Sequence, residues 1–267
     1  MTILRVLGVC SALLSAPYAS AEVVKMAVTT SFETSGLADV LLPAIYETLD
    51  IELQLLVVGT GQALRLGQAG DVDAVLVHAR AAEEAFVDAG YGTHRREIMY
   101  NDFVFAGPLD DPAGMKDAPS AASALNAVAQ AGAMFVSRGD DSGTHQAEMA
   151  LWAQAGIDPD GAWYRGVGAG MGAALNTATG LNAYVMSDRA SWIKFGNKGE
   201  LDLLFSGDPA LFNQYSFIPV SPGTYAHIPA AAIAELENWL TGPEAAALIN
   251  GYRVEGQQLF TFNAKAP

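Results

Sequence analysis

Residues 137–145 have the sequence Ser137-Arg138-Gly139-Asp140-Asp141-Ser142-Gly143-Thr144-His145, and this stretch decides the fold that we predict. An apolar run at 133–136, typical of a short buried strand, precedes it, and good helix formers follow at 146–153. The pattern predicts a strand-to-helix turn with Ser142 or Thr144 at or near the first helical turn. Unpaired N–H groups and the positive dipole end at a helix N-terminus bind anions, and an arginine fork adds charge-assisted donors. We interpret the stretch as a receptor for an oxyanion. Arg138 either binds that anion or forms a salt bridge with Asp140 or Asp141, and the two roles are compatible.

Strand-to-helix turns of a similar kind are expected at two earlier places in the chain. Apolar strands at 23–28 and 51–58 lead into Thr29-Thr30-Ser31 and Gly59-Thr60-Gly61. Helical patterns follow at 37–49, where Pro43 should kink the helix or mark a short first turn, and at 62–68. Hydroxyl side chains favour capping at such turns, and glycines let backbone N–H groups approach a ligand closely.

A glycine-rich stretch at 166–173 also precedes a predicted helix. It fits the dinucleotide-binding fingerprint poorly, because Met171 stands where the last glycine is needed. It is either a fourth loop of backbone donors or a plain flexible loop.

The rest of the chain alternates strands with helices. Strands are expected at 71–78, 100–108, 184–189, 201–205 and 213–220, and helices at 81–89, 120–131, 190–195, 230–240 and 243–250. This alternation argues for an α/β fold with largely parallel sheets. We expect strands near 105 and 215 to cross between two units, and the C-terminal helices to pack on the first.

Composition restricts the function further. The chain has 267 residues, 51% of them hydrophobic, which suits one large or two medium domains. Residues 1–21 have the pattern of a secretory signal peptide ending in Ala19-Ser20-Ala21, and the single cysteine, Cys10, lies inside it. We therefore expect no lipid anchor, disulfide or thiol chemistry in the mature chain, and no later stretch is apolar enough to insert into a membrane. The net charge of −15 disfavours nucleic acid and anionic lipid as partners.

Enzyme classes fit the sequence less well. Ser142 and His145 superficially suggest a serine hydrolase, but the G-x-S-x-G turn is absent. The four histidines show no metal-ligand spacing, and we interpret each as a surface or capping residue. A secreted hydrolase or phosphatase stays as the alternative class, and it would require turnover and a metal or an activating base beside Ser142.

Several stretches resemble the tungstate-binding proteins of bacterial ABC importers: 29–31 with 35–37, 58–64, 99–103, 137–145, 170–172 and 255–260. They occur in the family's order over nearly the whole mature chain, although Val28 and Ser187 stand where many members have threonine. The resemblance implies a two-lobed, type II-like periplasmic binding protein, each lobe a mostly parallel sheet flanked by helices, with the ligand between the lobes. It implies a monomer that is not an enzyme, needs no cofactor or metal and hands its anion to a membrane permease. Lobe 1 would comprise 22–104 plus 216–267, and lobe 2 would comprise 105–215. The implied ligand-binding residues are Thr30, Ser31, Thr60, Arg138, Ser142, Gly143 and Thr144, together with Gly170, Met171 and Gly172.

Phosphate and molybdate are the rival ligands. Arg138-x-Asp140-x-Ser142-Gly143-Thr144 also resembles the motif of phosphate-binding proteins. Phosphate near neutral pH usually carries a proton and needs a carboxylate acceptor, whereas tungstate and molybdate carry none. The turns at 29–31 and 59–61 contain no acid, which favours the unprotonated anions unless Asp140 points at the ligand. Size, shape and charge do not separate tungstate from molybdate, so that preference depends on the resemblance.

Overall fold

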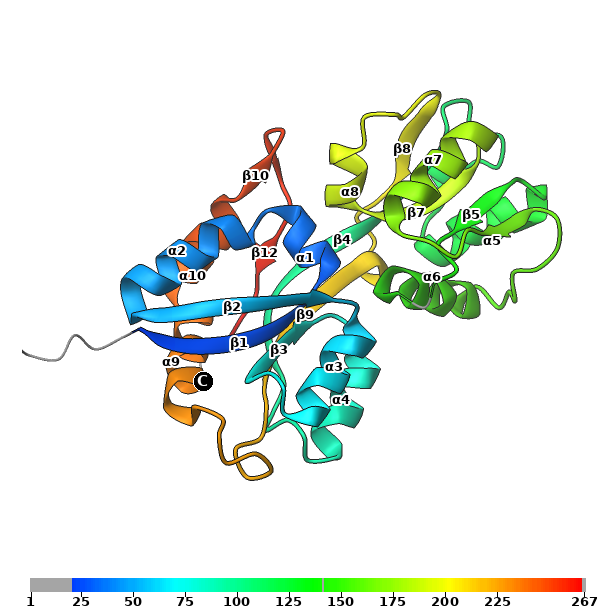
Figure 1. The fold of residues 1–267 in the computed structure, drawn as a ribbon. Helices are drawn as coiled ribbons and strands as arrows, with labels where there is room; N and C mark the ends of the chain where they lie inside the picture. Colours follow the sequence, from blue (N-terminus) through cyan, green and yellow to red (C-terminus); the bar gives the residue numbers. More distant parts are fainter. Residues whose placement is uncertain (1–20, 141, 266–267) are drawn as a thin grey trace, which may run out of the picture.

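The computed structural model describes residues 21–140 and 142–265, which form two lobes side by side, joined by a narrow waist (Figure 1). The predicted signal peptide lies outside the described residues except for Ala21. Within the described ranges, none of the helices combines the length and the apolar character needed to cross a bilayer.

The first lobe contains a sheet in the order β2-β1-β3-β9-β4. Its strands are β1 (Glu22–Thr29), β2 (Ile51–Val58), β3 (Ala74–Val77), β9 (Phe212–Pro219) and the first half of β4 (Arg96–Pro108). The short β12 (Thr261–Phe262) pairs with β4, and β10 (Arg253–Val254) with β11 (Gln257–Gln258) forms a separate hairpin. The helices of this lobe are α1 (Thr30–Ser35), α2 (Ala38–Leu49), α3 (Thr60–Ala69), α4 (Arg80–Asp88), α9 (Ala230–Leu240) and α10 (Pro243–Gly251).

The second lobe contains the other half of β4 together with β7 (Tyr184–Asp188), β5 (Phe135–Ser137), β6 (Tyr164–Gly166) and β8 (Leu201–Phe205). Its α-helices are α5 (Ala121–Ala131), α6 (Gly143–Gln154), α7 (Met171–Leu181) and α8 (Arg189–Lys194). Two short 3-10 helices complete it, η1 (Met115–Asp117) and η2 (Pro209–Leu211).

β4 connects the lobes because it belongs to both sheets. Its residues up to Asp102 pair with β9, and from Phe103 onward it pairs with β7. Arg189 of the second lobe donates from Nε and Nη2 to Asp102 at 2.7 and 2.5 Å, which ties the lobes together at this point. The sheets are parallel among β1, β2 and β3 and among β5, β6 and β7. β4 and β9, which run through the waist, pair antiparallel to their neighbours. They are an exception to the largely parallel sheets that the sequence predicts.

Each lobe has its own hydrophobic core. One cluster fills the first lobe and also includes Ala190 and Ile193 of α8, and two clusters cover opposite faces of the second sheet. Phe135 packs on one face with Trp152 of α6, while the next residue, Val136, packs on the other with Leu175 of α7. Successive side chains of a strand point to opposite faces, so both faces of this sheet must be apolar.

The structure differs from the predicted elements in several places. α2 runs through Pro43, so this proline does not mark the first turn of the helix, one of its two expected roles. The turn after β1 forms the separate helix α1, and β6 and β10 to β12 were not predicted. These strands have two or three residues each, too few for a periodic pattern to be visible in the sequence.

Candidate anion-binding site

A small cavity of about 30 Å³ lies between the lobes. Its lining comes from both sides: Thr29, Thr30, Ser31, Gly59, Thr60, His78, Arg138, Ser142, Gly143 and Thr144. One water molecule requires about 10–15 Å³ in comparable terms, and drug-sized ligands occupy about 300–1,000 Å³. The space therefore suits a small ion.

The N-termini of three helices meet at this cavity. Thr30, Thr60 and Gly143 line it and are the first residues of α1, α3 and α6. The first N–H groups of a helix have no partner within it, and the helix dipole is positive there. The cavity is therefore electropositive without a cluster of cations.

Thr60 provides evidence of a missing partner. The residue is 5% exposed, and its Oγ1 has no hydrogen-bond partner among the described residues. A buried hydroxyl left without a partner costs free energy, so such groups are rare and their presence points to an absent ligand or water.

The hydroxyls of the first lobe form a connected group. Thr29 Oγ1 accepts from the Phe32 N–H and so caps α1. Ser31 Oγ lies 3.0 Å from Thr29 Oγ1 and 2.9 Å from the Tyr215 hydroxyl. Burial raises the pKa of Tyr215 to about 12, so its phenol stays protonated at neutral pH.

On the second lobe, Asp140 holds Arg138. Asp140 Oδ2 accepts from Arg138 Nε at 3.1 Å and from Nη2 at 2.5 Å, and Oδ1 accepts from the Ser142 N–H at 3.2 Å. Ser142 caps α6 by accepting from the His145 N–H, as the sequence predicted. Burial raises the pKa of Asp140, but its hydrogen bonds with Ser142 and Arg138 outweigh that effect and hold the pKa below its usual value. The carboxylate stays ionised, faces Arg138 and is not among the lining residues of the small cavity.

Three predicted site residues lie elsewhere. Gly170, Met171 and Gly172 line a larger pocket of about 540 Å³ that shares Thr30, Ser31 and Arg138 with the small cavity. The structure thus brings seven of the ten predicted residues to the small cavity and places the α7 N-terminus at the wider part of the cleft.

His78 corrects the interpretation of the histidines as surface or capping residues. It lines the small cavity at the end of β3, with Nε2 at 3.3 Å from Ser31 Oγ and its ring centroid 4.8 Å from that of Tyr215. Burial lowers its pKa to about 4 and Arg138 acts in the same direction, against the opposing effects of its own backbone and Asn213. The imidazole is therefore neutral at pH 7. Thr29 and Gly59, which belong to the turns expected to hold donors, also line the cavity. Tyr215 supports the site through Ser31, and only its position within a predicted strand could have suggested this.

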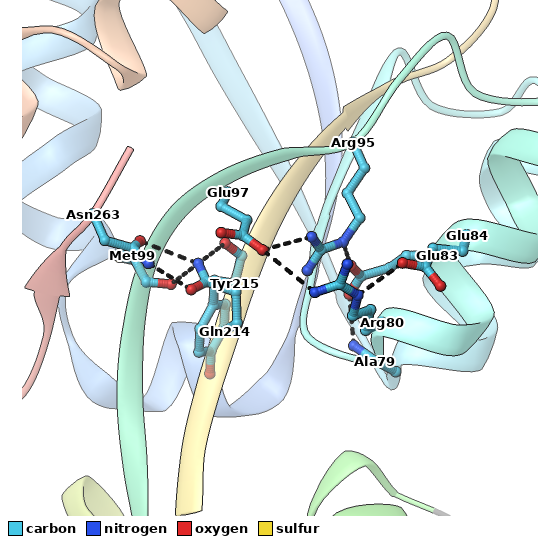
Figure 2. Close-up of polar contacts among 10 residues, drawn as sticks. All are labelled: Ala79, Arg80, Glu83, Glu84, Arg95, Glu97, Met99, Gln214, Tyr215 and Asn263. Carbon is cyan, nitrogen blue, oxygen red and sulfur yellow. Dashed lines mark hydrogen bonds and ion pairs between the residues drawn. The ribbon is translucent and has the colours of Figure 1, made fainter. Parts of the chain in front are cut away.

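A buried ion pair fixes the backbone next to His78. Glu83, 0% exposed, accepts from the Ala79 N–H and from Arg95 Nε, both at 2.6 Å. Figure 2 shows these residues and their contacts. Arg95 also donates to Glu97 at 2.8 Å. Burial raises the pKa of Glu83, and Arg95 opposes that shift. The start of α4, immediately after the cavity, is thereby held rigidly.

The described lining of the small cavity offers donors and no acidic side chain, whereas the larger pocket that shares Arg138 with it is also lined by Asp140 and Asp188. Nothing in residues 21–140 and 142–265 groups three or more histidine, cysteine or carboxylate side chains in a way that could hold a metal ion. The arrangement can bind a small anion that carries no proton.

Comparison with known proteins agrees with this geometry. Residues 16–244 match the family described as a PBP superfamily domain. The tungstate-binding protein TupA of Peptoclostridium acidaminophilum is 43% identical over 243 residues, covering 90% of this chain and 85% of that protein. The structure of the tungstate-binding protein TupA from Desulfovibrio alaskensis G20 is similar with a TM-score of 0.85 and 44% identity, covering 92% of this chain and all of that one. The structure described as the tungstate ABC transporter from Geobacter sulfurreducens has a TM-score of 0.78 and 46% identity, covering 86% and 99%.

Proposed function

The chain belongs to the PBP superfamily and, within it, to the tungstate-binding proteins, and from this premise we propose that it captures tungstate between its lobes for an ABC importer. It acts in the periplasm after removal of residues 1–21, as a monomer that passes the ion to a membrane permease. It performs no catalysis and needs no cofactor.

One observation carries the proposal: the buried Thr60 hydroxyl, without a partner in the described part of the chain, faces a cavity that Arg138 lines from the other lobe. The described lining contains hydroxyls, helix N-termini, a neutral imidazole and one guanidinium, but no carboxylate. This donor set suits an anion without a proton better than hydrogen phosphate. Molybdate has the same shape and charge, so it stays the main competitor.

The charges and hydrogen bonds suffice for tight binding. Tungstate carries two negative charges; Arg138 supplies one positive charge and the helix N-termini about +0.5 each. Hydrogen bonds to charged groups contribute about 1.5–3 kcal/mol each, and nanomolar affinity corresponds to about 12 kcal/mol. Six or seven donors therefore suffice after the costs of desolvation and lobe closure are subtracted.

We assign the donors to both lobes. Thr30, Ser31 and Thr60 bind the anion from the first lobe, and Arg138, Ser142, Gly143 and Thr144 bind it from the second lobe. Gly170, Met171 and Gly172 form the outer wall of the cleft. The hinge lies where β4 changes its pairing partner, between Asp102 and Phe103.

Calorimetric titration of residues 22–267 with tungstate, molybdate, sulfate and phosphate, each in a separate run, tests the proposal. We expect tight binding of tungstate and little or no heat with phosphate. Binding of phosphate alone would contradict the proposal and would mean that an acidic group faces the ligand. Hydrolysis of a phosphate ester by the purified protein would favour the alternative of a secreted phosphatase.

A further inference from the structure

His78 lines the cavity but is not among the residues assigned above as donors to the anion. Its ring lines the space between the lobes, yet Nδ1 is buried and has no hydrogen-bond partner among the described residues. We propose that His78 binds the anion directly, as a neutral imidazole that donates its Nδ1–H while Nε2 accepts from the Ser31 hydroxyl. The inference deepens the proposed function and rests on it.

The hydrogen bonds around Ser31 favour this tautomer. The serine hydroxyl has one proton and two acceptor positions. We assign Tyr215 and Thr29 as donors to Ser31 Oγ, from 2.9 and 3.0 Å, so that both of its acceptor positions are filled. The Ser31 proton is then available to His78 Nε2 at 3.3 Å. With Nε2 as acceptor, the ring proton of a neutral imidazole is on Nδ1.

The opposite tautomer fits the cavity poorly. It would place a bare Nδ1 lone pair in a buried site that binds a dianion, where the two would repel each other. An Nδ1–H makes no hydrogen bond to the described residues, although Asn213 and the His78 backbone also favour a protonated ring, and the anion provides an acceptor. Such a buried donor makes its hydrogen bond only in the bound state, so binding breaks no hydrogen bond within the protein and the new bond adds to the affinity.

The ring is also held in place before the anion binds. Ser31 and Tyr215 contact the ring on one side. The backbone N–H of the next residue, Ala79, donates to the Glu83 carboxylate, which the Arg95 ion pair holds in place (Figure 2). On the other side, a Cβ built on Gly143 would lie 2.4 Å from Cε1 and 2.9 Å from Nδ1 of His78. The second lobe therefore approaches the edge of the ring that carries Nδ1.

Two substitutions separate the two ring nitrogens. His78→Asn can place an amide N–H near the position of Nδ1, whereas His78→Gln reaches the position of Nε2 and loses the donor at Nδ1. His94→Gln is the control, because His94 lies in the first lobe away from the cavity, bonded to Thr93 and Glu237. Each variant and the wild type are titrated with sodium tungstate by calorimetry, after circular dichroism has verified that they are folded.

We expect tungstate affinity to fall at least tenfold in His78→Gln and to stay within about threefold in His78→Asn. His94→Gln should stay within twofold of the wild type. If the wild type binds tungstate and His78→Gln binds equally well, the role of His78 is refuted and the proposed function stands. An equal loss in His78→Asn and His78→Gln would refute the assignment to Nδ1. If the wild type binds none of the four oxyanions, the proposed function fails and this inference fails with it.

A measurement on the wild type gives an independent test. In protein labelled with ¹⁵N at histidine, the His78 ring should show a protonated Nδ1 and an unprotonated Nε2 at pH 7, and tungstate should shift the Nδ1 resonance most. Its signals are assigned by their absence in His78→Asn. A proton on Nε2 in the tungstate complex would overturn the proposal.

Discussion

Gly143→Ala tests whether the two lobes meet at the cavity as the structure shows. Gly143 is the first residue of α6, and its backbone does not require a glycine, since its φ lies outside the left-handed region. Alanine is the better helix former by about 1 kcal/mol in a helix interior. The substitution should therefore leave the second lobe as stable as before, or slightly more stable.

The affinity should change in the opposite direction. The added methyl group would lie 2.4 Å from Cε1 of His78, where ordinary contacts are 3.4–4 Å, so lobe or ring must retreat by at least 1 Å. His78 cannot swing away at low cost because Ser31 and Tyr215 hold it. Overpacking of this kind costs about 1–3 kcal/mol, which corresponds to a loss of tungstate affinity of roughly 5- to 150-fold.

Three measurements check this prediction. Calorimetry gives the affinity, thermal unfolding without ligand gives the stability, and small-angle X-ray scattering reports whether tungstate still makes the protein more compact. Gly180→Ala is the matched control, since Gly180 lies within α7 and a Cβ there meets nothing within 4 Å. If Gly143→Ala binds tungstate within twofold of the wild type and contracts equally, the lobes do not close on His78 and the reasoning is wrong.

Further substitutions and pH test other parts of the site. Arg138→Lys keeps the charge but loses the guanidinium fork, so calorimetry should show at least tenfold weaker tungstate binding; unchanged affinity would leave Arg138 with a structural role only. Lys194 of the second lobe donates to the carbonyl oxygens of Thr34 and Ser35 at the end of α1, at 2.6 and 3.0 Å. Lys194→Met should therefore release tungstate about two- to fivefold faster in stopped-flow experiments; an unchanged release rate would show that this contact does not hold the cleft closed. The pKa of His78 is lowered from 6.5 to about 4 in the folded protein. Between pH 4 and pH 6.5 the unfolded chain therefore binds more protons than the folded protein does. The free energy of unfolding without ligand should fall by on the order of 3 kcal/mol as the pH drops from 6.5 to 4. Denaturant unfolding should show this loss in the wild type and not in His78→Asn; parallel curves would mean that the imidazole is not buried as neutral.

The sequence alone determined most of the secondary structure and one half of the site. The strand at 51–58 was predicted with its observed bounds, because an alternating and then continuous apolar pattern encodes a strand locally. Ser142 caps α6 and Asp140 binds Arg138, as expected. Both interactions join residues three or fewer positions apart, so the motif specifies them without reference to the rest of the fold.

Only the tertiary structure decided which distant groups meet. His78 follows β3 without any motif around it, and Tyr215 lies on a strand that returns more than a hundred residues later, yet the antiparallel pairing of β3 with β9 brings both to Ser31. The contact between His78 and Gly143 depends on the angle between the lobes, which β4 sets where it passes from one sheet to the other. Local patterns report the conformation of neighbouring residues, whereas burial, pKa shifts and contacts across a cleft depend on how sheets and lobes pack.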